Sequence, residues 1–188
     1  MTQQEILLDV ARRLEGLNIE WMLVGSWACS TWGRPRFTHD VDMLVALRAE
    51  DIGRLVSAVQ DDYHTTPEML ADALFRGTPA NLIHMQAAEK VDVWVVGDDE
   101  YAAASLARRR RATVSGACVW ISSPEDAILA KLRWLQMADT RQHYDDALGV
   151  ATVQWGNLDL AYLREWADKL SLTENLGQLL REAEQATS

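Results

Sequence analysis

Residues 21–45, WMLVGSWACSTWGRPRFTHDVDMLV, contain the two features that decide the fold. The apolar residues at the start of this stretch predict a strand, and the pair Gly25-Ser26 predicts a turn that opens a short helix. After a basic loop, a second predicted strand carries Asp40-Val-Asp42. Because side chains alternate along a strand, we expect Asp40 and Asp42 on one face and the intervening valine on the buried face.

The chemistry of this stretch follows from its charges. Two neighbouring carboxylates repel each other unless a cation or a proton lies between them. A hard divalent ion such as Mg²⁺, which takes oxygen ligands, is the natural occupant. The backbone N–H groups at the Gly25-Ser26 helix start can bind phosphate. Taken alone, Ser26 is better explained as a helix N-cap, and only its spacing from Asp40 and Asp42 favours phosphate.

A Gly-Ser turn followed by a strand with Asp-x-Asp resembles the nucleotidyltransferase superfamily with the DNA polymerase β-like catalytic fold. WMLVGS and RFTHDVD are similar to its small bacterial branch, which includes abortive-infection and toxin nucleotidyltransferases. The resemblance extends over roughly residues 5–150. It includes KVDV, which matches the third acid of the family, and RRRRATVSGACVWISSPEDAILAKLRW, which resembles its later strand pair and Lys-bearing helix. The resemblance implies an α+β fold, with a twisted mixed sheet flanked by helices and a C-terminal helical extension.

The resemblance also implies a metal site. Asp40, Asp42 and Asp92 would hold two Mg²⁺ (or Mn²⁺) ions roughly 3.5–4 Å apart. A charge such as Asp92 in an apolar strand is costly unless it is paired or bound to a metal. The structural alternative for Asp92 is an ion pair with Lys90 or a nearby arginine.

A second set of residues is expected to bind the nucleotide: Gly25, Ser26, Arg36, Thr38 and Lys131. Arg36 is the candidate phosphate contact of the basic loop, since guanidinium pairs well with phosphate oxygens. An exposed arginine without a role is the alternative. The resemblance implies that Lys131, which is flanked by apolar residues, reaches the phosphates; snorkelling to water is the alternative.

Asp145 is the last candidate catalytic residue. The toxin-like branch has an acid near this position that assists activation of the acceptor hydroxyl. Arg141 precedes Asp145 by four residues, so a salt bridge across one helical turn is the default interpretation.

Length and composition set broad limits. A chain of 188 residues suits one domain with a helical extension, which we place as a catalytic core at 1–122 and a helical region at 123–188 packed on that core. Two cysteines far apart in sequence, no leader-like start and no long apolar run favour a cytoplasmic protein with no membrane partner. The C-terminal helices suggest either a monomer or a homodimer.

Four consecutive arginines stand out in a chain with a formal net charge of −10. We expect them to end a helix that spans 98–111, followed by a hairpin of 112–115 and 118–121. Cation placement at a helix C-terminus explains one or two of them. The cluster could bind a polyanion, either the nucleotide or an RNA acceptor, while a solvated charge run is the plain alternative. The net charge itself argues against nonspecific coating of nucleic acid.

Taken together, the residues and the resemblance predict a metal-dependent nucleotidyltransferase that moves NMP from an NTP to a hydroxyl acceptor. The acceptor could be tRNA, a protein or a small molecule. A toxin-like enzyme restrained by an antitoxin partner is one form of this prediction. The alternatives are a non-catalytic module that binds a nucleotide or a partner, and an aminoglycoside nucleotidyltransferase.

Overall fold

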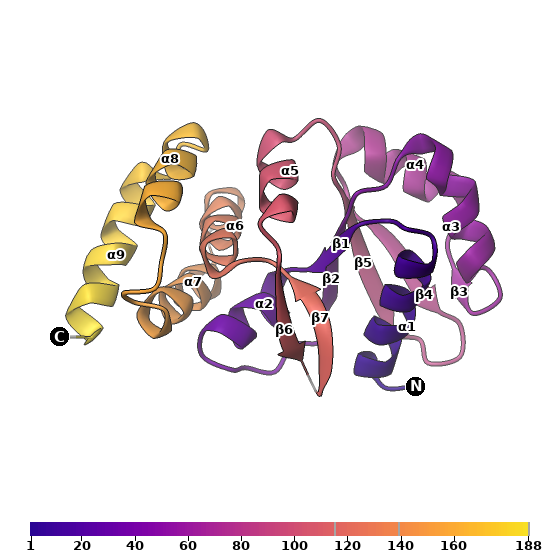
Figure 1. Ribbon diagram of the computed structural model, residues 1–188, viewed down its shortest axis with the longest axis horizontal. Helices are drawn as coiled ribbons and strands as arrows, with labels where there is room; N and C mark the ends of the chain where they lie inside the picture. The colour runs from indigo at the N-terminus through magenta and orange to yellow at the C-terminus, as the bar shows by residue number, and fades with distance from the viewer. Residues whose placement is uncertain (115, 139, 188) are drawn as a thin grey trace. The chain divides into compact units, whose positions relative to one another are not determined.

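The Asp-x-Asp segment lies in a mixed sheet whose strand order is β3-β4-β5-β2-β1-β7-β6 (Figure 1). The computed structural model describes residues 1–114, 116–138 and 140–187. Together with the helices, this sheet confirms the predicted α+β class. The strands are β1 (Trp21–Leu23), β2 (Val41–Val45), β3 (Tyr63–His64), β4 (Ala80–His84), β5 (Lys90–Val95), β6 (Arg110–Val114) and β7 (Ala117–Ile121).

Helices make up most of the remaining described chain. They are α1 (Gln3–Gly16), α2 (Gly25–Trp32), α3 (Ile52–Val59), α4 (Pro67–Arg76), α5 (Glu100–Ala107), α6 (Pro124–Met137), α7 (Arg141–Val153), α8 (Leu160–Lys169) and α9 (Thr173–Thr187), with a 3₁₀ turn, η1, at Ala49–Asp51. None of the helices formed by the described residues has the length and apolar composition needed to cross a bilayer.

Contacts divide the chain into two units. Unit 1 comprises 1–23 and 38–120, and unit 2 comprises 24–37 and 121–188. The short helix α2 thus groups with the C-terminal helices, although the chain reaches it directly from β1. The expected division into 1–122 and 123–188 stays a prediction.

Unit 1 is organised by the register of its central strands. β2 runs antiparallel to β1 and parallel to β5, and β5 runs antiparallel to β4. The β2–β5 register places Asp42 opposite Asp92, so both carboxylates project from the same face. The alternate residues Val41 and Val91 are buried. Strand alternation therefore separates a polar face from an apolar one at this point of the sheet.

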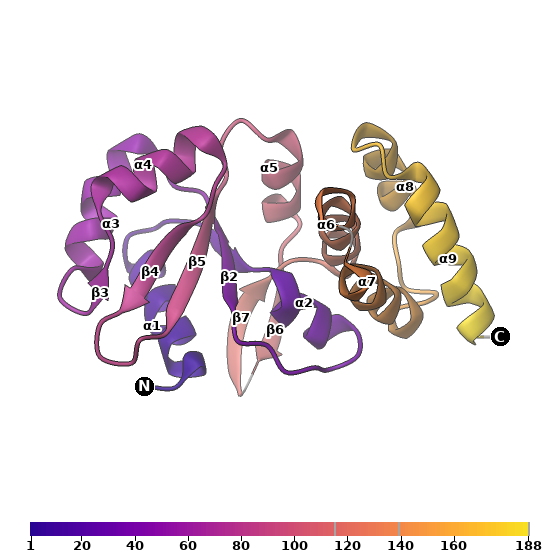
Figure 2. The same ribbon diagram turned by 180° about the vertical axis from the view of Figure 1, so that it is seen from behind.

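Helix α1 covers one face of this sheet, in front of β4 and β5 in Figure 1 and behind them in Figure 2. Thr2 caps the helix: its hydroxyl accepts from the Glu5 backbone N–H, and the Glu5 carboxylate accepts from the Thr2 backbone N–H. The residues of its buried stripe recur at the helical period: Ile6, Leu7, Val10, Ala11 and Leu14. α1 contacts α3, which in turn contacts α4.

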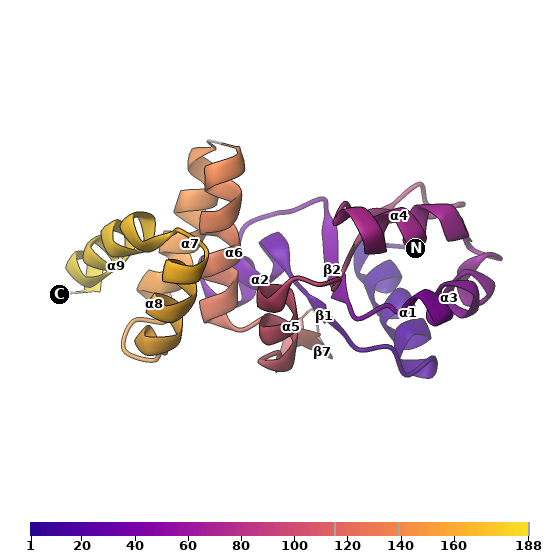
Figure 3. The same cartoon turned by 90° about the horizontal axis from the view of Figure 1, so that it is seen from above.

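Unit 2 is a bundle in which α6 and α7 lie side by side (Figure 3). α2 contacts both of them, and the Trp32 indole N–H donates to the Ser122 carbonyl oxygen over 2.7 Å. Ser123 caps α6 and Pro124 occupies its first turn. α8 contacts α6, and α9 contacts α7 and α8.

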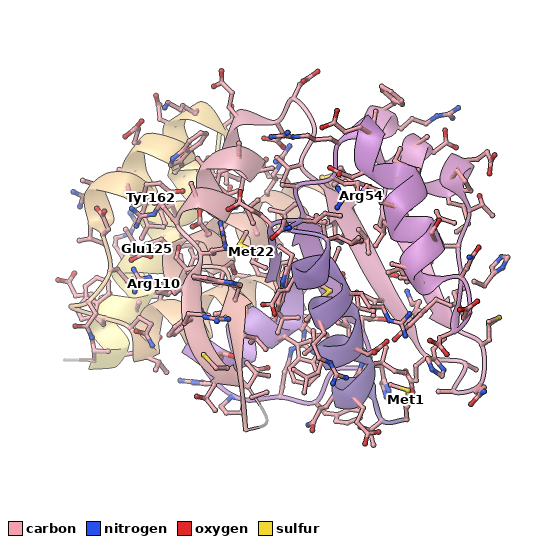
Figure 4. All side chains as sticks on the ribbon, turned by 45° about the vertical axis from the view of Figure 1, so that its right-hand side comes forward. Met1, Met22, Arg54, Arg110, Glu125 and Tyr162 are labelled. Atoms are coloured by element: carbon pink, nitrogen blue, oxygen red, sulfur yellow. The ribbon has the colours of Figure 1, made fainter. Side chains whose placement is uncertain are left out.

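The start of α6 contains two buried carboxylates, those of Glu125 and Asp126. Glu125 Oε1 accepts from the Asp159 backbone N–H, and Asp126 Oδ1 accepts from the Tyr162 hydroxyl; Figure 4 labels Glu125 and Tyr162. Since buried carboxylates need hydrogen-bond donors, these contacts satisfy both acids and tie α6 to the start of α8.

The structure corrects two sequence-based expectations. Asp40 lies one residue before β2 rather than within it, because the strand pairing with β5 begins at Val41. The four arginines do not end a helix: α5 stops at Ala107, and Arg110 and Arg111 belong to strand β6. β6 and β7 lie where the hairpin was expected, although Ser115 falls outside the described residues.

Candidate active site

The turn after β1 has the backbone that a helix-based phosphate site requires. Gly25, the first residue of α2, has φ of 62°, a conformation that favours glycine because other residues are strained there. Ser26 follows at the start of the same helix. The first-turn N–H groups of a helix have no intrahelical partner and carry the positive end of the helix dipole, so they are suited to anions.

Two cationic side chains converge on the Ser26 hydroxyl. Arg36 Nη2 donates to Ser26 Oγ over 2.5 Å, and Lys131 Nζ lies 3.5 Å from the same oxygen. Arg36 comes from the loop after α2, while Lys131 projects from the middle of α6. The structure thus brings together three residues that the sequence had predicted separately.

Asp146 is the counter-ion of both cations, and the sequence analysis missed it. Arg36 Nε and Nη2 lie 2.8 and 2.9 Å from its two carboxylate oxygens, and Lys131 Nζ lies 2.8 Å from Oδ2. The side chains of Lys131 and Asp146 are only 7% and 8% exposed. Burial alone would raise the pKa of the Asp146 carboxyl, but the hydrogen bonds and charges of Arg36 and Lys131 outweigh it and lower that pKa. We call Ser26, Arg36, Lys131 and Asp146 the cationic cluster.

The helical period of α7 explains why Asp146, rather than its neighbour, takes this role. Asp146 precedes the buried Val150 by four residues, so the two side chains share the inward face of the helix. Asp145 is rotated away: its side chain is 56% exposed, and it lies 3.7 Å from the guanidinium of Arg141. The predicted assistance of Asp145 to the acceptor hydroxyl stays a prediction.

A close backbone contact holds α2 against α7 next to this cluster. A Cβ atom on Gly33 would lie 2.7 Å from the Val150 nitrogen and 2.9 Å from the Cys29 carbonyl oxygen. Only a glycine fits such an approach without displacing backbone atoms. Gly33 therefore helps to fix the position of the loop that carries Arg36.

A cavity of about 680 Å³ opens beside the cationic cluster within unit 2. It is lined by Cys29, Arg34, Pro35, Arg36, Arg141, Gln142, Asp145, Asp146, Leu148 and Gly149. Burial raises the pKa of the Cys29 thiol to about 12, so this thiol stays protonated and does not act as a nucleophile at neutral pH. The charged residues that line the cavity are three arginines and two aspartates.

The carboxylates of unit 1 form a second charged group. Asp42 and Asp92 are register partners on parallel strands, and the Trp94 indole N–H lies 3.3 Å from Asp42 Oδ1. Asp40 is more exposed and precedes them in the chain. Its backbone N–H donates to the Thr38 hydroxyl oxygen over 3.4 Å, and the expected role of Thr38 in nucleotide binding stays a prediction.

Lys90 is the internal cation of this group. Its Nζ lies 2.7 Å from Asp92 Oδ2 and 3.7 Å from Asp40 Oδ1. The hydrogen bond to Asp92, with the charges of Asp92, Asp40 and Asp42, raises the pKa of Lys90 despite partial burial. Asn81 Nδ2 donates to the other Asp92 oxygen over 2.5 Å. We call Asp40, Asp42, Lys90 and Asp92 the carboxylate cluster.

The carboxylate cluster has the donor chemistry of a divalent-cation site. Within the described residues, no three acidic, histidine or cysteine side chains are arranged to hold a metal ion as they stand. Asp42 and Asp92 nevertheless present hard oxygen ligands on one face, and the ammonium of Lys90 already occupies the position of a cation beside Asp92 and Asp40. A divalent ion would have to displace this ammonium.

Solved structures of similar fold are nucleotidyltransferases. The antibiotic-resistance factor ANT(2'')-Ia, also solved in complex with adenylyl-2''-tobramycin, aligns with a TM-score of 0.58 at 16% identity, over 94% of this chain and 97% of that chain. An antigenic nucleotidyltransferase-like protein from Paracoccidioides brasiliensis aligns at 0.54 and 16% identity, over 94% and 91%. The lincosamide antibiotic adenylyltransferase LnuA, with lincomycin bound, aligns at 0.52 and 11% identity, over 81% and 98%.

The chain therefore has the nucleotidyltransferase fold, and the resemblance seen in its sequence is confirmed at this level. No protein-family model matches the sequence, and no curated protein sequence matches it.

Proposed function

We propose that this protein transfers a nucleoside monophosphate from an NTP to a hydroxyl acceptor. The observation that carries the proposal is the convergence of Arg36 and Lys131 on the Ser26 hydroxyl at the start of α2. A helix N-terminus flanked by a guanidinium and a buried ammonium is an arrangement suited to a polyphosphate.

In this proposal the cationic cluster binds the phosphates of the NTP. Gly25 and Ser26 offer backbone N–H groups, and Arg36 offers in-plane donors that fit phosphate oxygens. Asp146 holds the two cations in place before the nucleotide arrives, because it pairs with both of them in a largely buried position. Such preorganisation lowers the cost of ordering these side chains when the ligand binds.

The carboxylate cluster would hold Mg²⁺ or Mn²⁺ through Asp40, Asp42 and Asp92. A bound divalent ion would neutralise the triphosphate and lower the pKa of the acceptor hydroxyl. Asp92 would exchange the ammonium of Lys90 for the ion, while Asn81 would continue to donate to its other oxygen.

For the acceptor, a small hydroxyl-bearing molecule is supported by two observations. The neighbour ANT(2'')-Ia is an antibiotic-resistance factor and LnuA is a lincosamide antibiotic adenylyltransferase, and the cavity of about 680 Å³ has a volume typical of small-molecule sites. Three arginines and two aspartates line that cavity, so its charge does not select between a neutral acceptor and a cationic one such as an aminoglycoside. A tRNA or protein acceptor and a toxin role stay predictions, which a growth defect on expression, relieved by Asp42→Asn, would support.

The decisive experiment is calorimetric titration of the protein with each NTP, with and without Mg²⁺, in the wild type and in Asp42→Asn. We expect micromolar binding that depends on the metal and is lost in the variant, and pyrophosphate release from the wild type that falls by roughly 10³-fold in the variant. The matched control is Asp72→Asn, which removes an exposed carboxylate of unit 1 that pairs with Arg76.

Each other outcome has a definite meaning. If the wild type binds no NTP, the proposal is wrong and the domain is an interaction module. If NTP binds but no acceptor pool gives pyrophosphate release, the protein is a nucleotide-binding module. If Asp42→Asn turns over as fast as Asp72→Asn, the assignment of the metal to the carboxylate cluster fails.

A further inference from the structure

The β6–β7 hairpin of unit 1 combines arginines with a tryptophan. The guanidinium carbons of Arg109 and Arg111 lie 4.8 and 4.5 Å from the centroid of the Trp120 ring. At these distances both cations interact with the π face of the indole. Arg110, which Figure 4 labels, lies between them in the chain at the start of β6.

Strand alternation explains how this surface forms. On β7, Val119 and Ile121 are buried, so Cys118 and Trp120 face the other way. On β6, Arg111 lies on the face of Trp120, whereas Arg110 alternates to the face of the buried Val114. β6 is also the last strand in the strand order of the sheet. We call Arg109, Arg111 and Trp120 the arginine–tryptophan platform.

The platform concentrates positive charge in an acidic chain. Arg109 pairs with Glu20, with 2.6 Å between Nη2 and Oε1. Within the part of the chain that the structure describes, Arg111 has its contact with Trp120 but no carboxylate within salt-bridge distance. A guanidinium stacked on an aromatic ring keeps its in-plane N–H groups available for phosphate oxygens. Arg111 thus forms a local anion-binding site in a chain with a formal net charge of −10.

We propose that the arginine–tryptophan platform binds a single-stranded nucleic acid. Single strands are bound by cationic side chains that contact the phosphates together with aromatic rings on which bases stack. The platform supplies both on one hairpin. A base that stacks on Trp120 would replace or extend one of its guanidinium contacts, while Arg109 and the exposed Arg111 contact the flanking phosphates.

Two other occupants fit less well. A second copy of the chain could pair with the exposed edge of β6, but adjacent arginines on both copies would repel each other. Arginines alone would protect the edge strand β6 from pairing with a second copy. Protection therefore does not explain why the ring of Trp120 lies against them. An anionic membrane surface would match the charge, but it leaves the stacked ring without a role.

The proposal is independent of nucleotidyl transfer, because every residue of the platform lies outside both charged clusters. Binding is measured by fluorescence anisotropy with a labelled single-stranded RNA and with a DNA of the same sequence, each titrated at several salt concentrations. The test variant is Arg109→Gln/Arg111→Gln. The matched control is Arg48→Gln/Arg76→Gln, which removes two exposed arginines of unit 1 and the same net charge.

We expect the wild type and the control to bind with similar affinity, and the platform variant to bind about tenfold more weakly or worse. Loss of two phosphate contacts should also reduce the slope of log K against log salt by about 1.4. Trp120→Leu should weaken binding without changing that slope, because it removes stacking and leaves the charges. A stronger signal with RNA than with DNA, or the reverse, identifies the natural class.

Cys118 gives an independent readout of where the oligonucleotide binds. Its thiol is exposed two residues from Trp120 on β7, whereas the only other cysteine, Cys29, is buried. Bound oligonucleotide should therefore slow alkylation of Cys118 by iodoacetamide, and this protection should disappear in the platform variant. Circular dichroism and thermal melting establish that each variant is folded.

Several results would overturn the proposal. They are the absence of oligonucleotide binding at low salt, equal weakening of binding in the Arg48/Arg76 control, and oligonucleotide binding that leaves Cys118 alkylation unchanged. The proposal would also be wrong if the platform variant lost binding to anionic lipid vesicles as much as, or more than, it lost binding to oligonucleotides. Asp42→Asn should bind the oligonucleotide as the wild type does, so failure of the proposed catalysis would leave this result unaffected.

Discussion

The two charged clusters of this protein have opposite charges, and each contains one internal ion of the opposite sign. The carboxylate cluster of unit 1 gathers negative charge and holds it with an internal cation, Lys90. The cationic cluster of unit 2 gathers positive charge and holds it with an internal anion, Asp146. Each cluster thus contains a side chain whose charge matches that of the ligand we propose for it.

The clusters differ in how deeply that internal ion is buried. Lys90 is 46% exposed, whereas Asp146 is 8% exposed. Exposed ion pairs contribute about 0–1 kcal/mol, but removing one partner of a buried pair leaves an uncompensated charge in a poorly solvated position. The comparison teaches that Lys90 can be displaced at little cost, while Asp146 is a permanent part of its cluster.

The largest expected effect is that of Asp146→Asn. It should lower the free energy of unfolding by about 3–5 kcal/mol, since Arg36 and Lys131 lose their shared counter-ion. The neighbouring Asp145→Asn is the control and should change it by less than about 1 kcal/mol. Urea unfolding measures both. Equal effects of the two variants would remove the distinction between the buried and the exposed acid.

A smaller effect is expected from Gly33→Ala. A methyl group at this position would press on the backbone of α7 and should destabilise the protein by about 1–3 kcal/mol, while it displaces the loop that carries Arg36. The control is Gly53→Ala in α3 of unit 1, where nothing lies within 4 Å, and there alanine should stabilise the helix by about 0.5–1 kcal/mol. Thermal melting would show changes in stability of opposite sign for the two variants. A Gly33→Ala variant with unchanged stability would argue against a rigid cationic cluster.

Lys90→Met tests whether the ammonium of Lys90 competes with a divalent ion for the carboxylate cluster. Stability should change by less than about 1 kcal/mol, and Mn²⁺ should bind up to about tenfold more tightly because the competing ammonium is gone. Mn²⁺ binding can be followed by electron paramagnetic resonance. Lys169→Met, which removes a similarly exposed lysine paired with Glu165, should leave Mn²⁺ binding unchanged. Weaker Mn²⁺ binding in Lys90→Met would mean that Lys90 supports the site rather than competes for it.

The smallest expected effect is a pH dependence of protein stability that arises from His143. Burial, and then the positive charge of Lys131, lowers the pKa of His143 below its usual value of 6.5. The unfolded chain therefore takes up the proton first, so this residue makes stability fall as pH decreases below about 6.5. The His143→Gln variant should show a shallower fall between pH 6.5 and 5 than the wild type, as measured by urea unfolding. An identical slope would show that the pKa of His143 is not lowered in the folded protein.

Local patterns predicted the elements but not the partners of their side chains. The Gly25-Ser26 turn, the capped start of α1 and the Ser123-Pro124 start of α6 follow from residues close in sequence, and the structure has all three. The pairing of Asp92 with Lys90 was foreseen as an alternative because the two lie on one strand, two residues apart.

The errors in the sequence-based predictions arose where contacts between distant segments determine the local structure. Alanine-rich α5 suggested a helix that continues through the arginines, but those residues join the sheet next to β7. Asp146 was passed over for Asp145, although the buried residues of α7 mark the inward face of that helix. The convergence of Arg36 and Lys131 joins residues ninety-five positions apart, which no local pattern encodes.

The hydrogen bonds of the two acids at the start of α6 have a consequence for Lys131. Glu125 and Asp126 are held by donors from the beginning of α8, and Lys131 projects from the same helix little more than a turn further on. Loosening α8 would remove these donors from two buried acids on the helix that carries the ammonium we propose for the nucleotide. If that proposal holds, mutations in α8 that remove these hydrogen bonds should also weaken nucleotide binding, although α8 lies outside the cationic cluster.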